Sequence, residues 1–445
     1  MSLTPAIPRS TQRRARGVPH LFQVLDCASP FRPPSRHSLA GVDEILLGRG
    51  DGAVREGSTL RLGIPDVSMS ASHARLLRGV EGFLVEDCGS TNGTFLNGEP
   101  VAGRALADGD ALEMGHTHFL FRAEAPPGEN ATPAHPALAT LSPALAAELG
   151  SVPAIARSML PVVIGGETGT GKELLARALH DLSGRRGPFV AVNCGAIAGT
   201  LLETELFGHR RGAFTGAVET RSGLIRAADR GTLFLDEIAD LSPAAQAALL
   251  RVLQENEVLA VGATAPVRVD VRILAATHMD LAEAVAAQRF RADLYARISG
   301  FTLRLLPLRR RREDLGLLIA AVLRKAGASS ARFTPEAGRA LLRHRWPLNV
   351  RELERCIGAA LVLAGGLPID VRHLPESVAR PLPAPVPGLR ARNLSETDAQ
   401  MRERLSSLLR ENAGNVAAVA RSLGKARMQV HRWVKRFDLS LADYR

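Results

Sequence analysis

Residues 166–173 read GETGTGKE, and this stretch decides the fold of the middle of the chain. It follows the apolar run PVVIGG and opens the helical pattern KELLARALHDL, which is the context that a phosphate-binding loop requires. Glycines allow backbone N–H groups to close around phosphates, and Lys172 supplies a positive charge. The residue after the lysine is Glu173, where serine or threonine is usual. The stretch predicts phosphate binding, with an ordinary glycine-rich turn as the alternative.

A second strand, further along the chain, ends in two acidic residues. The sequence GTLFLDEI places Asp236 and Glu237 directly after four strand-like residues. Ligands of open α/β sheets bind at the carboxyl ends of the strands. Asp236 would hold Mg²⁺ and Glu237 would orient the attacking water. Two solvated acids at a strand end are the alternative, but the glycine loop favours a nucleoside triphosphatase.

Around these motifs, strand-like runs alternate with helical patterns from about residue 138 to 308. PVVIGG, PFVAVN, TLFLDE and VRILAAT are the strand-like runs, and KELLARALHDL and PAAQAALLRVLQ are helical. This alternation predicts an α/β domain with a mostly parallel sheet. Residues 309–378 have purely helical patterns, which predicts an all-helical segment, here named the lid, after that domain.

The 445 residues are too many for one ordinary core, so several domains are expected. Glycine turns separate short strand patterns in the N-terminal part, and prolines mark the linkers. The expected divisions are a disordered basic tail (1–19), a β-domain (20–123), a linker (124–137), the α/β domain (138–308), the lid (309–378), a Pro-rich linker (379–395) and a helical C-terminal domain (396–445).

Composition fits a globular protein, with 46% hydrophobic and 23% charged residues. The net charge of +11 favours polyanionic partners such as nucleic acid or nucleotides, although a GC-rich genome would also raise the arginine content. We expect no membrane span and no secretory signal. The four scattered cysteines favour a reducing compartment, and hence a cytoplasmic protein without a membrane partner.

The stretch ELFGHRRGAFTGA, residues 205–217, carries a specific family resemblance. The chain resembles the sigma-54-dependent activators, or bacterial enhancer-binding proteins, whose AAA+ module has a GAFTGA loop. That resemblance implies an ATPase that uses ATP and Mg²⁺, assembles into a homo-oligomeric ring and presses this loop against sigma-54 of RNA polymerase. The loop residues here are Gly212, Ala213, Phe214, Thr215, Gly216 and Ala217.

The resemblance covers about residues 160–375 and implies further roles. Asn193 would hold the catalytic Glu237 in check, and Arg291 and Arg297 would reach a neighbouring subunit's ATP. Thr277 and Arg351 would sense the γ-phosphate. The remaining ATP-binding residues are Gly166, Glu167, Thr168, Gly169, Thr170, Gly171, Lys172, Glu173 and Asp236.

Several positions depart from the family pattern. His278 stands where the family has asparagine, and Leu348 replaces a usual glycine. Arg210 and Arg211 replace an acidic–basic pair before the loop. The stretch 136–160 is Ala-rich and lacks the family's adenine-seating segment. The run 309–312 resembles the family's segment leading into the lid, for which we expect a structural role.

The N-terminal domain resembles a forkhead-associated (FHA) domain. LLGR (46–49), SASHA (70–74) and DCGSTNGTFLNG (87–98) carry the resemblance, which implies an antiparallel β-sandwich that binds phosphothreonine. The binding residues would be Arg49, Ser70, Thr91 and Asn92, since hydroxyl, amide and guanidinium groups donate to a dianionic phosphate and its peptide. His73 is expected to be structural. A sandwich that no longer binds phosphate is the alternative.

Residues 401–437 resemble a Fis-type helix-turn-helix. Leu405, Leu408 and Leu409 form one apolar stripe, and Asn415 is the expected N-cap of the second helix. Six Arg or Lys and no acid lie between residues 421 and 436, which favours a helix in a DNA major groove over a solvated face. The expected DNA contacts are Arg427, Gln429 and His431 at base edges and Arg432, Lys435 and Arg436 at phosphates.

Together these features predict a sigma-54-dependent transcriptional activator that a phosphothreonine-containing partner regulates. Two alternatives stay open. One is a phosphopeptide-reading DNA-binding regulator with a degenerate ATPase, and the other is a ring that remodels a different protein.

Overall fold

The computed structural model describes residues 17–80, 82–126, 133–197, 199–213, 217–380, 405–410, 412, 415–423 and 430. The chain divides into two compact units, Met1–Pro381 and Leu382–Arg445. None of the described helices combines the length and the apolar character needed to cross a membrane.

The N-terminal part of the first unit is a β-sandwich of two six-stranded sheets. The sheet orders are β2-β1-β12-β11-β8-β9 and β10-β7-β6-β3-β5-β4. All pairs are antiparallel except β3 with β5, which refines the expected antiparallel fold. Inward side chains such as Ile45, Leu76 and Phe119 are fully buried between the sheets. The strands are β1 (Val18–Asp26), β2 (Ser35–Ser38), β3 (Glu44–Arg49), β4 (Gly52–Glu56), β5 (Thr59–Ile64), β6 (Ala74–Gly79), β7 (Gly82–Asp87), β8 (Thr94–Leu96), β9 (Glu99–Pro100), β10 (Gly103–Ala105), β11 (Ala111–Met114) and β12 (Thr117–Ala125).

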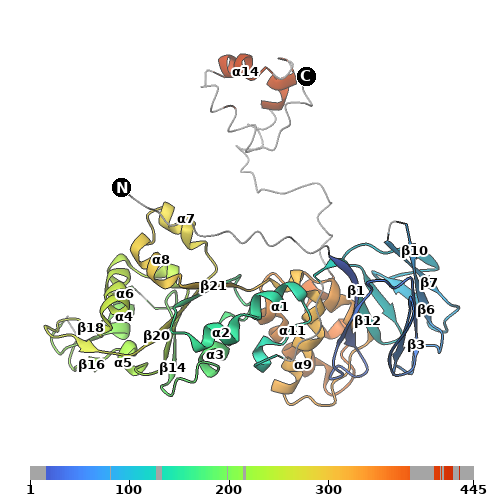
Figure 1. The fold of residues 1–445 in the computed structure, drawn as a ribbon, viewed down its shortest axis with the longest axis horizontal. Coiled ribbons are helices and arrows are strands. Elements are labelled where there is room, and N and C mark those ends of the chain that lie inside the picture. Colours follow the sequence, from blue (N-terminus) through green and yellow to red (C-terminus); the bar gives the residue numbers. More distant parts are fainter. Residues whose placement is uncertain are drawn as a thin grey trace. The chain divides into compact units, whose positions relative to one another are not determined.

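The middle of the chain is an α/β domain around a five-stranded parallel sheet, as the alternation of patterns predicts (Figure 1). The strand order is β14-β17-β20-β13-β21. Its strands are β13 (Val162–Gly165), β14 (Phe189–Asn193), β17 (Thr232–Asp236), β20 (Arg272–Thr277) and β21 (Phe301–Arg304). Its helices are α1 (Pro143–Leu149), α2 (Val152–Arg157), α3 (Lys172–Asp181), α4 (Gly199–Phe207), α5 (Leu224–Ala227), α6 (Pro243–Glu255), α7 (Leu281–Ala286) and α8 (Ala292–Ile298).

Alternate residues of each central strand enter opposite cores, because side chains of a strand point to alternating faces. Leu233 and Leu235 pack with the core that contains α4, α6 and α8, whereas Phe234 packs with the core that contains α2 and α3. Both faces of the sheet are therefore covered, which explains the nearly continuous apolar runs in the sequence. Short elements complete the domain, namely η1 (Pro136–Leu138), η2 (Ile238–Asp240), β15 (Gly208–His209), β16 (Arg221–Ser222), β18 (Glu257–Val258) and β19 (Val267–Arg268).

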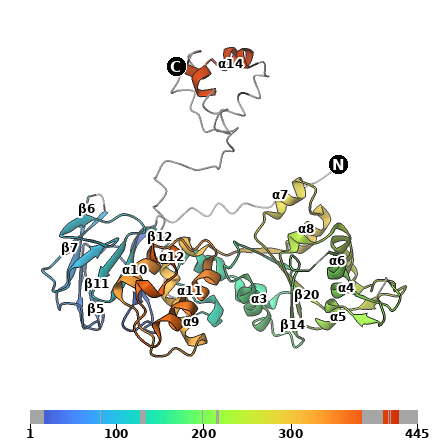
Figure 2. The same ribbon diagram turned by 180° about the vertical axis from the view of Figure 1, so that it is seen from behind.

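The lid follows directly and is helical, as expected. Figure 2 shows its helices beside the strands of the sandwich. It begins with two single-turn 3₁₀ helices, η3 (Leu308–Arg310) and η4 (Arg312–Asp314). The remaining helices are α9 (Leu315–Lys325), α10 (Pro335–Arg343), α11 (Asn349–Ala364), η5 (Val371–His373) and α12 (Glu376–Ala379).

The second unit is described only in part. Residues 405–410 are helical and α14 spans Val416–Ser422. Leu405 and Leu409 are buried with Val419, and the side chain of Asn415 accepts a hydrogen bond from the amide of Ala418 at 3.3 Å. Asn415 is thus the N-cap expected from the sequence. Of the expected third helix only Val430 is described, and it is buried in the same core; all six candidate DNA contacts lie outside the described residues.

Candidate functional site

The loop 166–173 joins β13 to α3, which begins at Lys172. Gly169 and Gly171 have φ angles of +78° and +102°, a region that favours glycine. The Lys172 side chain is 6% exposed, and its ammonium donates to the carbonyl of Gly166 at 3.0 Å. Thr170 Oγ1 donates to the carbonyl of Glu167 at 2.7 Å, which closes the loop on itself. The loop thus has the strand–loop–helix geometry that suits a phosphate.

The lid and the segment leading into it donate hydrogen bonds to carbonyl oxygens of the same loop. The amide of Val350 donates to the carbonyl of Gly169 at 2.9 Å, and Asn349 Nδ2 donates to that of Thr168 at 3.0 Å. Arg311 donates to the carbonyl of Thr170 at 2.8 Å. These contacts use carbonyl oxygens of the loop and none of its amides. Two of the loop amides are used elsewhere, since Gly166 and Thr170 donate to the carbonyls of Thr277 and Glu167 at 3.2 and 3.3 Å.

An ion pair between Glu167 and Arg309 also holds the glycine loop against the segment that leads into the lid. Arg309 donates to both carboxylate oxygens, at 2.5 and 2.7 Å, and Asn349 donates to one of them at 3.3 Å. The hydrogen bonds from Arg309 lower the pKa of Glu167, against the opposing effect of burial. Arg309 and Arg311 were expected to be structural, and their direct contacts with the loop were not foreseen. The sequence feature that could have indicated these contacts is the position of the two arginines, immediately before the lid.

Asp236 and Glu237 stand at the carboxyl end of β17, beside the loop. Burial raises the pKa of Asp236 above its ordinary value, and the positive charge of Lys172 opposes that shift. Glu237 has a φ of +53°, an uncommon left-handed conformation for a non-glycine residue. Its Oε1 lies 3.4 Å from the Lys172 ammonium. The two carboxylates and the lysine therefore form one cluster.

His278 holds the other oxygen of Glu237. The ring Nδ1 lies 2.7 Å from Oε2, and the His278 amide donates to the same oxygen at 3.2 Å. Burial alone would raise the pKa of Glu237, but the hydrogen bonds from His278 and the charge of Lys172 outweigh it and lower that pKa. The sequence marked His278 only as a departure from the family pattern, and gave no sign of this contact.

Asn193, Thr277 and Arg351 lie around this cluster. Asn193 pairs with Asp236 across β14 and β17, but its side chain accepts from the amides of Gly195 and Ala196 at 3.0 and 3.1 Å. Thr277 ends β20 and is buried. Arg351 lies in the first turn of α11, next to Gly169. Glu173 is turned away, in an exposed pair with Arg177.

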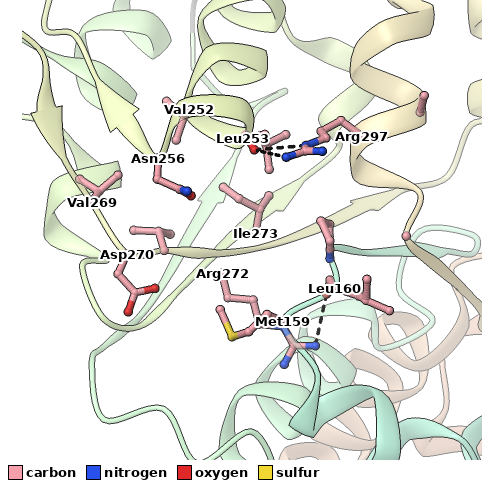
Figure 3. A pocket seen from close by; sticks show the side chains of 14 residues that line it. Met159, Leu160, Val252, Leu253, Asn256, Val269, Asp270, Arg272, Ile273 and Arg297 are labelled. Atoms are coloured by element: carbon pink, nitrogen blue, oxygen red, sulfur yellow. Dashed lines mark hydrogen bonds between the residues drawn. The ribbon is translucent and has the colours of Figure 1, made fainter.

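The two arginines expected to act on a neighbouring subunit lie on or beside α8. Arg291 makes a bidentate pair with Asp293, with the closest contact 2.7 Å. Arg297 donates to the carbonyl of Leu253 at 3.1 and 3.2 Å, at the rim of a cavity of about 420 Å³ (Figure 3). Arg272, which is 1% exposed, lies at the base of the same cavity and donates to the carbonyls of Ala156 and Ile155.

The GAFTGA loop is described at its base. The amide of Gly212 donates to the carbonyl of Ala217 at 2.9 Å, and Ala213 donates to that of Arg210 at 3.1 Å. Below this closure, β15 pairs with β16. Phe214, Thr215 and Gly216 at the tip lie outside the described residues.

The predicted phosphopeptide residues converge at one end of the β-sandwich. The amide of Arg49 donates to the carbonyl of Ser70 at 2.8 Å, and Ser70 Oγ accepts from the amide of Thr91 at 3.1 Å. Asn92 donates to the carbonyl of Ser68 at 2.8 Å. His73 is fully buried and, as expected, is structural: it accepts from the Ser70 amide at 3.1 Å and contacts the carbonyl of Gly93 at 3.2 Å.

Sequence profiles of known families match three parts of the chain. They are the Sigma-54 interaction domain at residues 138–304, an AAA+ ATPase lid domain at 309–385 and an FHA domain at 45–115. The "Transcriptional regulatory protein ZraR" of Escherichia coli (strain K12) is 42% identical over 319 residues, covering 71% of each chain. The chain belongs to the family of sigma-54-interacting AAA+ transcriptional regulators.

Other relatives of this chain are also named as transcription regulators. The "Anaerobic nitric oxide reductase transcription regulator NorR" of Enterobacter sp. (strain 638) is 44% identical over 320 residues, which are 69% of this chain and 64% of that protein. The chain therefore spans slightly less than two thirds of that relative's length. A solved structure of NtrX from Brucella abortus in complex with ATP has a TM-score of 0.51 and 32% identity, covering 68% of this chain and 70% of that chain.

Proposed function

We propose that this protein is a sigma-54-dependent transcriptional activator that hydrolyses ATP in a homo-oligomeric ring. The observation that carries the proposal is the cluster of Lys172, Asp236 and Glu237 beside a glycine loop that joins a strand to a helix and contacts the lid through its carbonyl oxygens. Lys172 and the loop would bind the phosphates, and Asp236 would hold the Mg²⁺ that accompanies them, which would neutralise charge on the phosphates. Glu237 orients the attacking water.

The neighbouring subunit completes each site. Arg291 and Arg297 approach the γ-phosphate from α8 of that neighbour, while Thr277 and Arg351 report its presence within the subunit. Turnover moves the loop 212–217 against sigma-54, which remodels the RNA polymerase holoenzyme at the promoter. The loop is identical in sequence to the family's GAFTGA loop, which supports sigma-54 as its target.

The outer domains supply location and control. The C-terminal helix-turn-helix binds double-stranded DNA upstream of the promoter. Its arginines and lysines neutralise phosphates of the DNA backbone. The FHA domain binds a phosphothreonine-containing protein, the product of a Ser/Thr kinase, through Arg49, Ser70, Thr91 and Asn92. Convergence of these residues at one end of the sandwich supports that role.

The decisive experiment measures ATP hydrolysis over a range of protein concentrations, with Glu237→Gln as control. Specific activity should rise with concentration as rings form, and Glu237→Gln should bind ATP without turnover. Absence of turnover at every concentration would favour the alternative of a DNA-binding phosphopeptide reader with a degenerate ATPase.

A second experiment tests the target. Thr215→Ala should retain ATP hydrolysis but lose open-complex formation by the sigma-54 holoenzyme. If Thr215→Ala opens promoters normally, or if no complex with sigma-54 forms with a transition-state mimic of ATP, the ring acts on another protein.

A further inference from the structure

The FHA sandwich and the AAA+ lid share one hydrophobic core. Side chains from β1 and β12 are buried together with side chains from the lid helices (Figure 2). The sandwich contributes Phe22, Val24, Leu25, Cys27 and Leu120, and the lid contributes residues that include Leu315, Ile319, Phe333, Ala337 and Leu341. Two domains joined in this way are expected to move together, unlike domains on a linker.

Two lid glycines permit the close approach. A Cβ atom at Gly316 of α9 would lie 1.8 Å from the carbonyl oxygen of Val24, and one at Gly338 of α10 would lie 2.5 Å from Cys27 Sγ. The amide of Phe333 also donates to the carbonyl of Cys27 at 2.8 Å. The backbones of the two domains are therefore in direct contact.

Ion pairs fix the orientation of this contact. Arg339 of α10 donates two hydrogen bonds of 2.7 Å to Glu113 of β11, whose side chain is 7% exposed. Arg122 of β12 donates to Glu313 of η4 at 2.9 Å, and Glu313 is 4% exposed. Removing one member of such a buried pair leaves an uncompensated charge, so the pairs specify one docked arrangement.

The contact leads to the nucleotide loop on one side. Arg312 donates to the carbonyl of Gly109 in the sandwich at 2.9 Å, and its neighbour Glu313 binds Arg122. One residue earlier, Arg311 donates to the loop at Thr170. The short segment 309–313 thus touches the FHA domain and the glycine loop at once.

The contact leads to the phosphopeptide loop on the other side. Thr91 and Asn92 lie one residue before β8, and the guanidinium of Arg339 lies 5.5 Å from the centroid of the Phe95 ring in that strand. Arg339 therefore joins β8 and Glu113 to the lid. A conformational change in the loop that binds phosphothreonine can therefore be transmitted to α10 through these packed side chains.

We propose that the FHA phosphopeptide loops and the nucleotide site are coupled through this shared core, with Arg339 and segment 309–313 as its two contact points. The inference rests on the proposed binding of nucleotide at the glycine loop. Because coupling between two binding sites is reciprocal, a nucleotide that reseats the lid must change the affinity of the FHA loops for phosphothreonine by the same factor by which phosphothreonine changes the affinity for nucleotide.

The test uses hydrogen exchange of the full chain with and without saturating ADP, so that no phosphopeptide is needed. We expect protection at residues 166–173 and an exchange rate changed by at least about twofold across residues 91–97. Arg339→Ala should keep the response at 166–173 and lose the response at 91–97. Arg104→Ala, which removes an exposed ion pair with Glu99 in the same domain, should keep both responses.

The outcomes separate the two proposals. Protection of 166–173 without any change at 91–97 in the wild-type chain overturns the coupling but leaves nucleotide binding intact. Survival of the response at 91–97 in both Arg339→Ala and Glu113→Gln also overturns it. Glu113→Gln preserves the side-chain shape but removes the charge that pairs with Arg339. If Arg339→Ala does not fold, Glu113→Gln replaces it in the test and should lose the response at 91–97. Absence of ADP protection at 166–173 refutes nucleotide binding at the loop, and the coupling falls with it.

Discussion

Oε2 of Glu237 accepts hydrogen bonds from both the ring and the backbone amide of His278, at 2.7 and 3.2 Å. Asn193, which the family resemblance assigns to the restraint of this glutamate, instead accepts from two amides of its own loop. In this conformation His278 therefore holds the carboxylate that is proposed to orient water.

Replacing His278 by asparagine should raise the turnover number of ATP hydrolysis. The shorter side chain loses the ring contact, and a hydrogen bond to a charged group is worth enough to permit an increase of up to about tenfold. KM for ATP should change little, because His278 contacts Glu237 and not the glycine loop. Steady-state kinetics of His278→Asn and of the double variant with Asn193→Ala would check this; a fall in kcat for the single variant would contradict it.

Mixed rings should reveal that each active site is shared. Lys172→Ala removes the phosphate ligand of a subunit's own site, and Arg297→Ala removes the group offered to the next subunit. Each variant alone should be inactive. In an equal random mixture about a quarter of the interfaces pair an intact loop with an intact arginine, so about a quarter of the activity should return. If mixing restores nothing, Arg297 does not act in trans.

Leu348 and Asn349 should respond very differently to substitution. Leu348 has a φ of −101°, its side chain is half exposed and its backbone carbonyl lies beside Gly169, so Leu348→Gly should change stability by less than about 1 kcal/mol. Asn349 is fully buried, has a φ of +56° and bonds to Leu308 and Thr168. Asn349→Ala should destabilise the protein by at least about 2 kcal/mol and raise KM for ATP. Calorimetry and ATPase kinetics of the two variants would distinguish them, and equal effects would refute this role of Asn349.

His73 should be required for the shape of the phosphopeptide loops. His73→Ala leaves the partly buried amide of Ser70 without its acceptor, which costs up to about 1–3 kcal/mol. We expect a lower midpoint of unfolding for the FHA domain and weaker binding to a phosphothreonine peptide pool. Arg49→Ala should weaken that binding without lowering stability, since no described side-chain contact depends on it. Undiminished binding by His73→Ala would contradict this.

Local patterns predicted the parallel sheet, the glycine loop and the helices of residues 309–378, because each depends on the spacing of residues within one short segment. The resemblance to FHA domains implied the β-sandwich. The contact between His278 and Glu237 joins the ends of two strands and could not be read from either strand alone. Gly316 interrupts an apolar helical run, and nothing nearby in the sequence indicates that a carbonyl of β1 lies against it. Domain docking depends on such pairings, and these were not predicted.

The glycine loop is held at the carbonyls of Thr168, Gly169 and Thr170 by residues that all come from the lid or the segment leading into it. Truncation before Leu308 would leave those oxygens to water and free the loop to sample many shapes. Much of the affinity of such a fragment for nucleotide would then be lost as entropy of ordering. The helical appendage is in this sense part of the phosphate receptor, and a minimal ATP-binding fragment cannot be cut out along the sheet alone.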